Sequence, residues 1–165
     1  MRVLGIDPGS NVTGYGIVEG RGSALTHIDN GIIAPGRGRT FPQRLHGIYG
    51  DLRALMERFE PDAVAVENVF VAKNARSSLV LGHARGVAML AACEAGLAPA
   101  EYSPSEVKLA VTGSGRATKE QIQRMVRAIL GLAEVAAEDA SDALAVAICH
   151  LNTQGMARRL EGSKR

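Results

Sequence analysis

Residues 1–16, MRVLGIDPGSNVTGYG, carry the pattern from which the fold can be inferred. Residues 3–6 form a short apolar run around a glycine, which is typical of a buried strand. Asp7 ends the run, and because it precedes a proline its backbone is expected to remain extended. The Pro-Gly-Ser-Asn sequence at 8–11 predicts a tight turn. Residues 13–18 then predict a second strand that returns beside the first.

Asp7 is the unusual residue of this stretch. It places a carboxylate at the carboxyl end of a buried strand, next to a tight turn that contains glycine. Such a carboxylate either caps the turn or faces a cation, and this stretch is compatible with both interpretations. Other parts of the sequence are needed to distinguish these two interpretations.

The length and composition are those of one globular domain. A chain of 165 residues and 17.3 kDa can bury a real core. Its 46% hydrophobic and 22% charged residues are the balance of a soluble protein. Aromatic residues are scarce and Trp is absent, so the core must consist of Val, Ile, Leu and Ala. We expect a single domain over residues 1–155 and a polar, flexible tail over 156–165.

The cysteines and apolar segments favour a cytoplasmic protein. Cys93 and Cys149 both lie in apolar helical patterns, which predicts buried thiols rather than a disulfide. No signal-peptide pattern opens the sequence. The longest apolar run, at 86–93, is far shorter than the roughly 20 residues that span a bilayer. We therefore expect no membrane segment and a cytoplasmic location.

Charge is distributed unevenly along the chain. The net charge is only +2. Residues 71–127, however, contain eight basic and four acidic residues, while the other carboxylates collect in the first seventy residues and around 134–142. This distribution suits a protein that binds phosphates with one part and cations with another, although an ordinary mixed surface would also fit.

The remaining elements follow from apolar spacing and capping residues. A strand over 24–34 would complete an antiparallel meander, and the apolar run at 63–66 indicates a strand covered on both faces. Helices are predicted from Thr40 to about residue 60, over 75–95, from Ser103, from Thr118 to about 130 and from Asp139 to about 152, with a last strand over 97–102. This order predicts an α/β fold with one five-stranded mixed sheet, a three-strand antiparallel meander plus parallel strands, flanked by helices.

Two acidic residues occupy matching positions on the predicted strands. Asp7 ends the first buried strand, and Glu67 directly follows the apolar run at 63–66. Ligands of open α/β sheets bind beyond the carboxyl ends of the strands. If these two strands are parallel neighbours, both carboxylates lie at the same end of the sheet. The joint pattern favours a functional role over chance.

A third acidic element is the sequence Glu-Asp-Ala-Ser-Asp at 138–142. Asp139 and Asp142 are three residues apart, so within a helix their side chains share one face. Asp139 could instead cap the helix, where its dipole favours an acid. Asp142 borders a run of core residues, so that explanation suits it less well.

Four carboxylates brought together would raise one another's pKa values, and divalent cations remove that penalty. Hard oxygen ligands favour Mg²⁺ or Mn²⁺. Two such ions about 3.5–4 Å apart form a clamp for in-line attack on a phosphodiester. The sequence has no zinc-type Cys/His spacing, and residues 113–119 lack the Gly-Lys-Ser/Thr order of a phosphate loop. The residues themselves therefore predict a metal-dependent nuclease.

Four sequence blocks resemble the bacterial crossover (Holliday) junction endodeoxyribonuclease RuvC family, which has a ribonuclease H-like fold. The blocks are GIDPG at 5–9, ENVFVAKN at 67–74, LGHARG at 81–86 and DASDALA at 139–145. The middle of this pattern is much more specific than the DPG turn, and the resemblance covers nearly the whole chain. It implies an endonuclease that resolves four-way DNA junctions by paired, symmetric, metal-dependent phosphodiester hydrolysis during recombination and repair.

The resemblance also implies roles for individual residues. The catalytic, metal-binding acids would be Asp7, Glu67, Asp139 and Asp142. The resemblance assigns DNA-binding roles to an aromatic that inserts at the branch point and to two cleft lysines: Phe70, Lys108 and Lys119. From the basic character of the same region we expect Lys73, Arg76 and Arg116 to bind DNA as well. The expected cofactor is Mg²⁺, with Mn²⁺ able to substitute and two ions per active site.

The resemblance implies partners as well. The family acts as a homodimer on four-way junction DNA and works alongside a branch-migration motor. Two positions differ from the expected pattern. Residue 83 is His where Gln is expected, and some relatives have His rather than Asp at position 139.

Two other functional classes fit parts of the sequence. The glycine-rich start also resembles the first phosphate turn of actin-like ATPases and sugar kinases, but those proteins enclose a nucleotide between two lobes and 165 residues supply one. A non-catalytic junction-binding module is the other alternative. The presence of all four acids disfavours it, because a pure binder gains nothing from carboxylates that face phosphates.

Overall fold

The computed structural model describes residues 1–36, 38–68 and 74–162, with side chains to residue 157. The elements in chain order are β1 (Arg2–Asp7), β2 (Thr13–Arg21), β3 (Ala24–Ile33), α1 (Phe41–Phe59), β4 (Ala63–Glu67), α2 (Ala75–Glu94), β5 (Ala100–Tyr102), α3 (Pro104–Thr112), α4 (Lys119–Leu130) and α5 (Glu138–Gly162). The predicted order of strands and helices is confirmed, including the capping box of Ser103 and Glu106 that begins α3.

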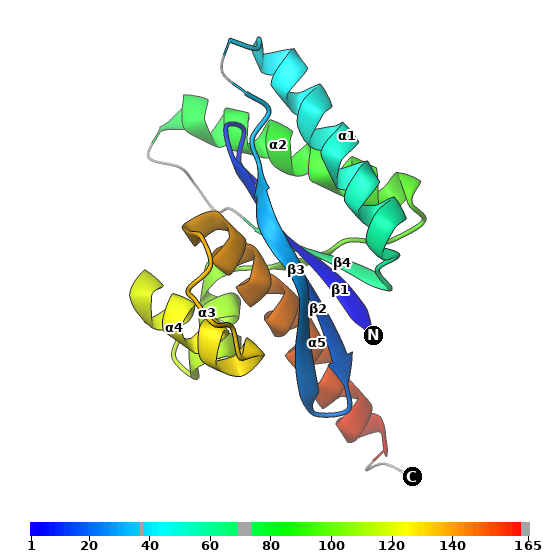
Figure 1. Cartoon of the computed structure of the whole chain (residues 1–165), viewed down its shortest axis with the longest axis vertical. Helices are drawn as coiled ribbons and strands as arrows, with labels where there is room; N and C mark the ends of the chain where they lie inside the picture. The colour runs from blue at the N-terminus through cyan, green and yellow to red at the C-terminus, as the bar shows by residue number, and fades with distance from the viewer. Residues whose placement is uncertain (37, 69–73, 163–165) are drawn as a thin grey trace.

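The strands form one five-stranded sheet in the order β3-β2-β1-β4-β5 (Figure 1). β2 pairs antiparallel with both β1 and β3, which gives the predicted meander. β4 pairs parallel with both β1 and β5. The continuously apolar strands β1 and β4 are therefore both inner strands, as their sequences require.

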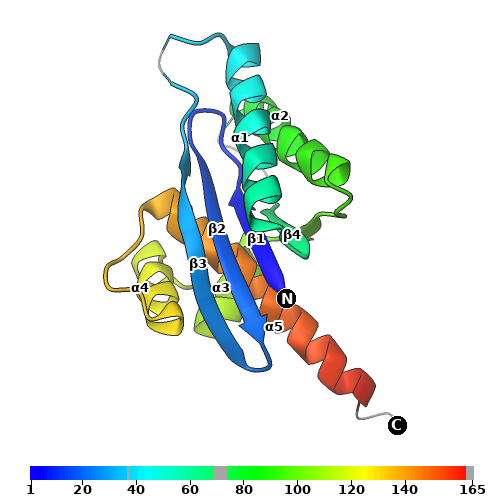
Figure 2. The same ribbon diagram turned by 45° about the vertical axis from the view of Figure 1, so that its right-hand side comes forward.

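Each face of the sheet is covered by its own set of helices. The side chains of Leu4 and Ile6 pack with Leu52 of α1 and with the alanines of α2. On the other face, Val3 packs with Leu144 of α5 and with apolar residues of α3 and α4. Figure 2 shows α1 and α2 on one side of the strands and α3, α4 and α5 on the other. The alternation of side chains along β1 thus builds two separate cores.

Helix α5 packs unusually close to β1 and β2, because these strands have glycines where the helix crosses. A β-carbon at Gly5 would lie 2.1 Å from the Ala143 carbonyl oxygen, and one at Gly14 would lie 1.9 Å from the Asp139 carbonyl oxygen. Gly16, which pairs with Gly5 in the sheet, is also in close contact with the helix: a β-carbon there would lie 2.7 Å from the Leu144 backbone nitrogen. Only glycine leaves room for the helix at these positions.

Three details differ from the sequence-based expectations. Helix α5 continues to Gly162, whereas we expected it to end near residue 152; Met, Ala, Arg and Leu after Gly155 all favour helix. Strand β5 begins at Ala100 rather than at residue 97. Cys93 is exposed and not buried, because it lies on the side of α2 away from the sheet, while Cys149 is buried as predicted. In the described part of the chain, no helix is both long and apolar enough to cross a membrane.

Candidate active site

Asp7 and Glu67 leave neighbouring parallel strands at the same end. Ile6 pairs with Val66 in the sheet, and the two acids follow these residues directly. The turn after Asp7 is held by Thr13, whose hydroxyl donates to the Gly9 carbonyl oxygen at 2.7 Å. Both carboxylates therefore lie beyond the carboxyl ends of the inner strands, where ligands of such sheets bind.

Helix α5 brings the second pair of acids to this end of the sheet. Asp7 pairs with Gly14 across β1 and β2, and Gly14 lies against the Asp139 backbone. Asp142 is one helical turn further and its side chain is mostly covered, with 22% of its surface exposed. The glycine contact thus places the start of α5 beside Asp7.

The electrostatics of Asp7 show that the four acids lie close enough to affect one another. Burial, followed by the charges of Glu67, Asp142 and Asp139, raises the pKa of Asp7 from 3.8 to about 8. A hydrogen bond between the Asp7 and Glu67 carboxyl groups adds to this shift. At neutral pH the cluster therefore either holds a proton or requires a bound cation to balance its negative charge.

The other two inward acids are affected in the same direction. Burial and the charge of Asp142 raise the pKa of Glu67. Burial also raises the pKa of Asp142, with smaller contributions from the neighbouring acids. The ammonium groups of Lys119 and Lys108 act against these shifts at both carboxyls. The cluster is thus acidic in its centre and basic at its margin.

The donor set of this cluster suits a hard divalent cation, since all four groups supply carboxylate oxygens. Within the described residues, however, no three His, Cys, Asp or Glu side chains are arranged to hold a metal ion as they stand. Asp142 instead has Lys119 3.8 Å away, and Asp7 is hydrogen-bonded to Glu67. The raised pKa values of Asp7, Glu67 and Asp142 nevertheless indicate a crowding of negative charge that a bound cation would relieve.

Comparison with known proteins identifies the family. A family model described as crossover junction endodeoxyribonuclease RuvC matches residues 3–150. The chain belongs to this family. A crossover junction endodeoxyribonuclease RuvC from Trichlorobacter lovleyi is 57% identical over 93% of this chain and 86% of the relative. One from Geobacter sulfurreducens is 56% identical over 94% of this chain and 95% of the relative.

Solved structures of RuvC proteins agree with this assignment. Thermus thermophilus RuvC in complex with a Holliday junction substrate matches with a TM-score of 0.90 and 34% identity, over 95% of this chain and 96% of that one. The yeast mitochondrial Holliday junction resolvase has a TM-score of 0.68 at 14% identity, which shows a shared fold. The predicted ribonuclease H-like fold class is confirmed.

The structure describes four of the six predicted DNA-binding residues of this RuvC family member. Lys108 is half-buried on α3, and Lys119 is the first residue of α4. Arg116 is exposed in the loop between these helices, and Arg76 is exposed in the first turn of α2. Phe70 and Lys73 lie outside the described residues, so their predicted roles stay predictions.

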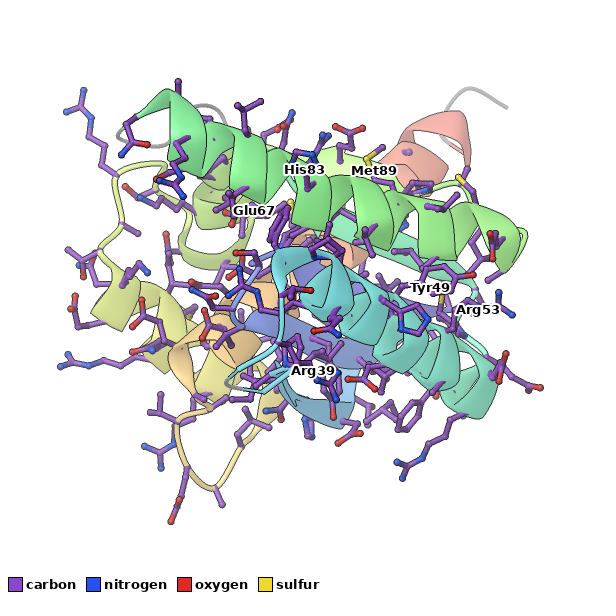
Figure 3. The ribbon with its side chains drawn as sticks, turned by 90° about the horizontal axis from the view of Figure 1, so that it is seen from above. Arg39, Tyr49, Arg53, Glu67, His83 and Met89 are labelled. Atoms are coloured by element: carbon purple, nitrogen blue, oxygen red, sulfur yellow. The ribbon has the colours of Figure 1, made fainter. Side chains whose placement is uncertain are left out.

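The structure adds Arg44, which sequence reasoning missed. Its guanidinium donates to the Asn11 side-chain oxygen at 2.9 Å, which ties α1 to the turn after Asp7. It also lies over the ring of Phe41, and that ring packs edge-on against His83 of α2. In the view of Figure 3, Glu67 lies between α2 and the strands, and His83 lies on α2. No local pattern could reveal contacts between residues so far apart in sequence.

A second missed residue is Glu138, the first residue of α5. Its carboxylate accepts a hydrogen bond from the Lys119 ammonium group, the same group that lies near Asp142. The sequence suggested only an acid favoured by the helix dipole. The contact could not be foreseen, since it requires knowing that α4 and α5 begin side by side.

One cavity of the described residues is not part of this site. It has a volume of about 830 Å³ and is lined by Met1 of the chain start, Gly22 of the β2–β3 turn and Met156 of α5, among others. These residues lie at the opposite end of the sheet from Asp7. The cavity therefore lies away from the acidic cluster.

Proposed function

We propose that this chain resolves four-way DNA junctions by hydrolysing phosphodiester bonds at the acidic cluster, with Asp7, Glu67, Asp139 and Asp142 as its catalytic and metal-binding residues. The observation that carries the proposal is the raised pKa of Asp7, caused by burial and by the other three acids. Such crowding of carboxylates costs stability and is retained where function needs it. Membership of the RuvC family supplies the reaction class.

The four carboxylates would hold Mg²⁺, with Mn²⁺ able to replace it and two ions in each site. When bound, such ions activate water and stabilise the leaving 3′ oxygen. Asp7 and Glu67 hold the strand side of the site, and Asp139 and Asp142 hold the helix side. Because the glycines of β1 and β2 set the distance between the two sides, the backbone fixes the spacing of the ligands.

The basic residues would hold the DNA over these acids. Lys108 and Lys119 already moderate the negative potential at Glu67 and Asp142. We propose that both bind phosphates next to the scissile bond, and that Arg76 and Arg116 bind the backbone further out, together with Lys73. Phe70, three residues after Glu67 in the sequence, is proposed to stack on bases at the branch point.

The outer face of α2 is proposed to form a homodimer interface with a second copy of this chain. Leu79 and Leu90 are 65% and 53% exposed, and Gly82 and Gly86 lie between them on the same helical stripe with open space beside them. A closed two-fold dimer presents two identical active sites, which matches the two-fold symmetry of a four-way junction. A branch-migration motor is proposed as a further partner, on the strength of the family alone, and the cytoplasm as the location.

The experiment compares a synthetic four-way junction with a linear duplex of the same sequence, in Mg²⁺ and in EDTA. We expect paired cuts in the junction, little cutting of the duplex and no cutting in EDTA. Asp7→Asn should abolish cutting and leave junction binding in place. Binding without cleavage by the parental protein in Mg²⁺ would support the non-catalytic module instead, and an active Asp7→Asn variant would remove Asp7 from the proposed mechanism.

A further inference from the structure

Lys119 has two acidic partners that differ in their surroundings. Its ammonium group is hydrogen-bonded to the carboxylate of Glu138, and it lies 3.8 Å from a carboxylate oxygen of Asp142. Asp142 belongs to the acidic cluster and is only 22% exposed. The Glu138 side chain is 59% exposed. Lys119 therefore bridges the catalytic cluster and an acid outside it.

Glu138 presents to Lys119 what a DNA phosphate would present, namely an anionic oxygen that accepts a charge-assisted hydrogen bond. Both side chains of this pair are mostly exposed, at 62% and 59%. Exposed ion pairs are weak, so a strand phosphate can replace the carboxylate at small cost. Because Glu138 and Asp142 both already form ion pairs with the ammonium group, a phosphate that binds it competes with the exposed Glu138 carboxylate for its N–H donors.

We propose that Glu138 is a positioning residue that occupies Lys119 in the DNA-free protein and is displaced by a phosphate of the bound strand. The inference rests on the proposed function to the extent that Lys119 contacts DNA. Its consequence is selectivity. DNA that does not contact the acidic cluster has to displace Glu138 from the lysine without the compensating contacts that a junction makes at the cluster. Glu138 therefore weakens the binding of such DNA.

The test is equilibrium binding of the full chain to a synthetic four-way junction in EDTA, at several salt concentrations. Glu138→Gln removes the competing charge and keeps the size of the side chain. It should tighten binding about two- to fivefold, the range expected when an exposed ion pair no longer has to be broken. The slope of log K against log salt should steepen by up to about 0.9, since Lys119 then releases a counterion on binding phosphate.

Two further variants separate this competition from a general change in charge. Glu134→Gln removes the same charge from the loop just before α5, where Glu134 is exposed, and should change affinity by clearly less. In a Lys119→Met background, Glu138→Gln should have no further effect, because it acts through Lys119. Thermal unfolding checks that each variant is folded.

Three results would overturn the inference: no tightening by Glu138→Gln, equal tightening by Glu134→Gln, or the same tightening when Lys119 is already Met. The last two would show that only net charge matters. These outcomes differ from a failure of the proposed function, which would appear as a parental protein that neither binds nor cuts the junction.

Discussion

Gly14 of β2 lies directly under the Asp139 carbonyl of α5, so close that a β-carbon at position 14 would come within 1.9 Å of that oxygen. Gly14 also pairs with Asp7 across the sheet. A single glycine thus joins the strand that carries one acid to the helix that carries another. Because Gly14 has no side chain, β2 and α5 can approach closely enough to bring the two parts of the acidic cluster together.

This relationship predicts the effect of Gly14→Ala. The added methyl group must push α5 away from β2, and such overpacking costs about 1–3 kcal/mol. We expect a lower midpoint of urea unfolding and a loss of cleavage, because Asp139 and Asp142 move away from Asp7. Gly50→Ala in α1 is the control. Its β-carbon would meet nothing within 4 Å, and alanine favours helix, so stability should be unchanged or higher. A fully stable, active Gly14→Ala protein would contradict the role of the close contact.

The raised pKa of Asp7 predicts that the stability of the protein depends on pH. Its pKa rises from 3.8 in the unfolded chain to about 8 in the folded one, so the folded state binds this proton more tightly. The resulting stabilisation is complete below pH 3.8 and is lost as the pH rises towards 8. Asp7→Asn keeps a neutral side chain at every pH. The melting temperature of the variant, relative to that of the parental protein, should therefore rise between pH 5 and pH 8.

Divalent cations should reverse this difference. A ligand that binds only the folded state stabilises it in proportion to the logarithm of its concentration over its dissociation constant. Mg²⁺ should raise the melting temperature of the parental protein at pH 8 and raise that of Asp7→Asn by less. Thermal unfolding with and without Mg²⁺ measures both. Equal gains in the two proteins would mean that Asp7 does not hold the metal ion.

The contact between Arg44 and Asn11 predicts a coupled effect on cleavage. A hydrogen bond to a charged group contributes about 1.5–3 kcal/mol at most, and less at an exposed site such as this. Arg44→Met and Asn11→Ala should each slow single-turnover cleavage several-fold by loosening the turn after Asp7. The double variant should be no slower than the worse single one. Additive losses would show that the two residues act independently.

The sequence predicted those features that depend on local pattern. The order of strands and helices follows from apolar spacing and from caps such as Ser103, and the acids were found because each ends a strand or begins a helix. The close approach of α5 was missed, since nothing local marks Gly14 as a contact point. The pairing of Glu138 with Lys119 and of Arg44 with Asn11 was missed for the same reason. These contacts form only once distant segments have packed.

The last prediction concerns the outer face of α2. Leu90→Glu places a charge in the proposed interface, and burying like charges from the two subunits there is strongly unfavourable. We expect the variant to be a monomer in ultracentrifugation, with an unchanged melting temperature, because Leu90 is exposed in the single chain. On a supercoiled plasmid with a cruciform, the parental protein should give linear product by paired nicking within one complex. The monomeric variant should accumulate relaxed circles.

Leu109→Glu provides the matched control for this experiment. Leu109 is 57% exposed on α3, on the other face of the sheet from α2. The same change of charge there should leave both the oligomeric state and the linear product unaltered. If Leu90→Glu remains a dimer that makes paired cuts, the interface does not involve Leu90. If both variants are monomers, the effect comes from charge alone. Only a monomer specific to the α2 substitution, with unpaired nicks as its product, agrees with a dimer built on α2 to match the symmetry of the junction.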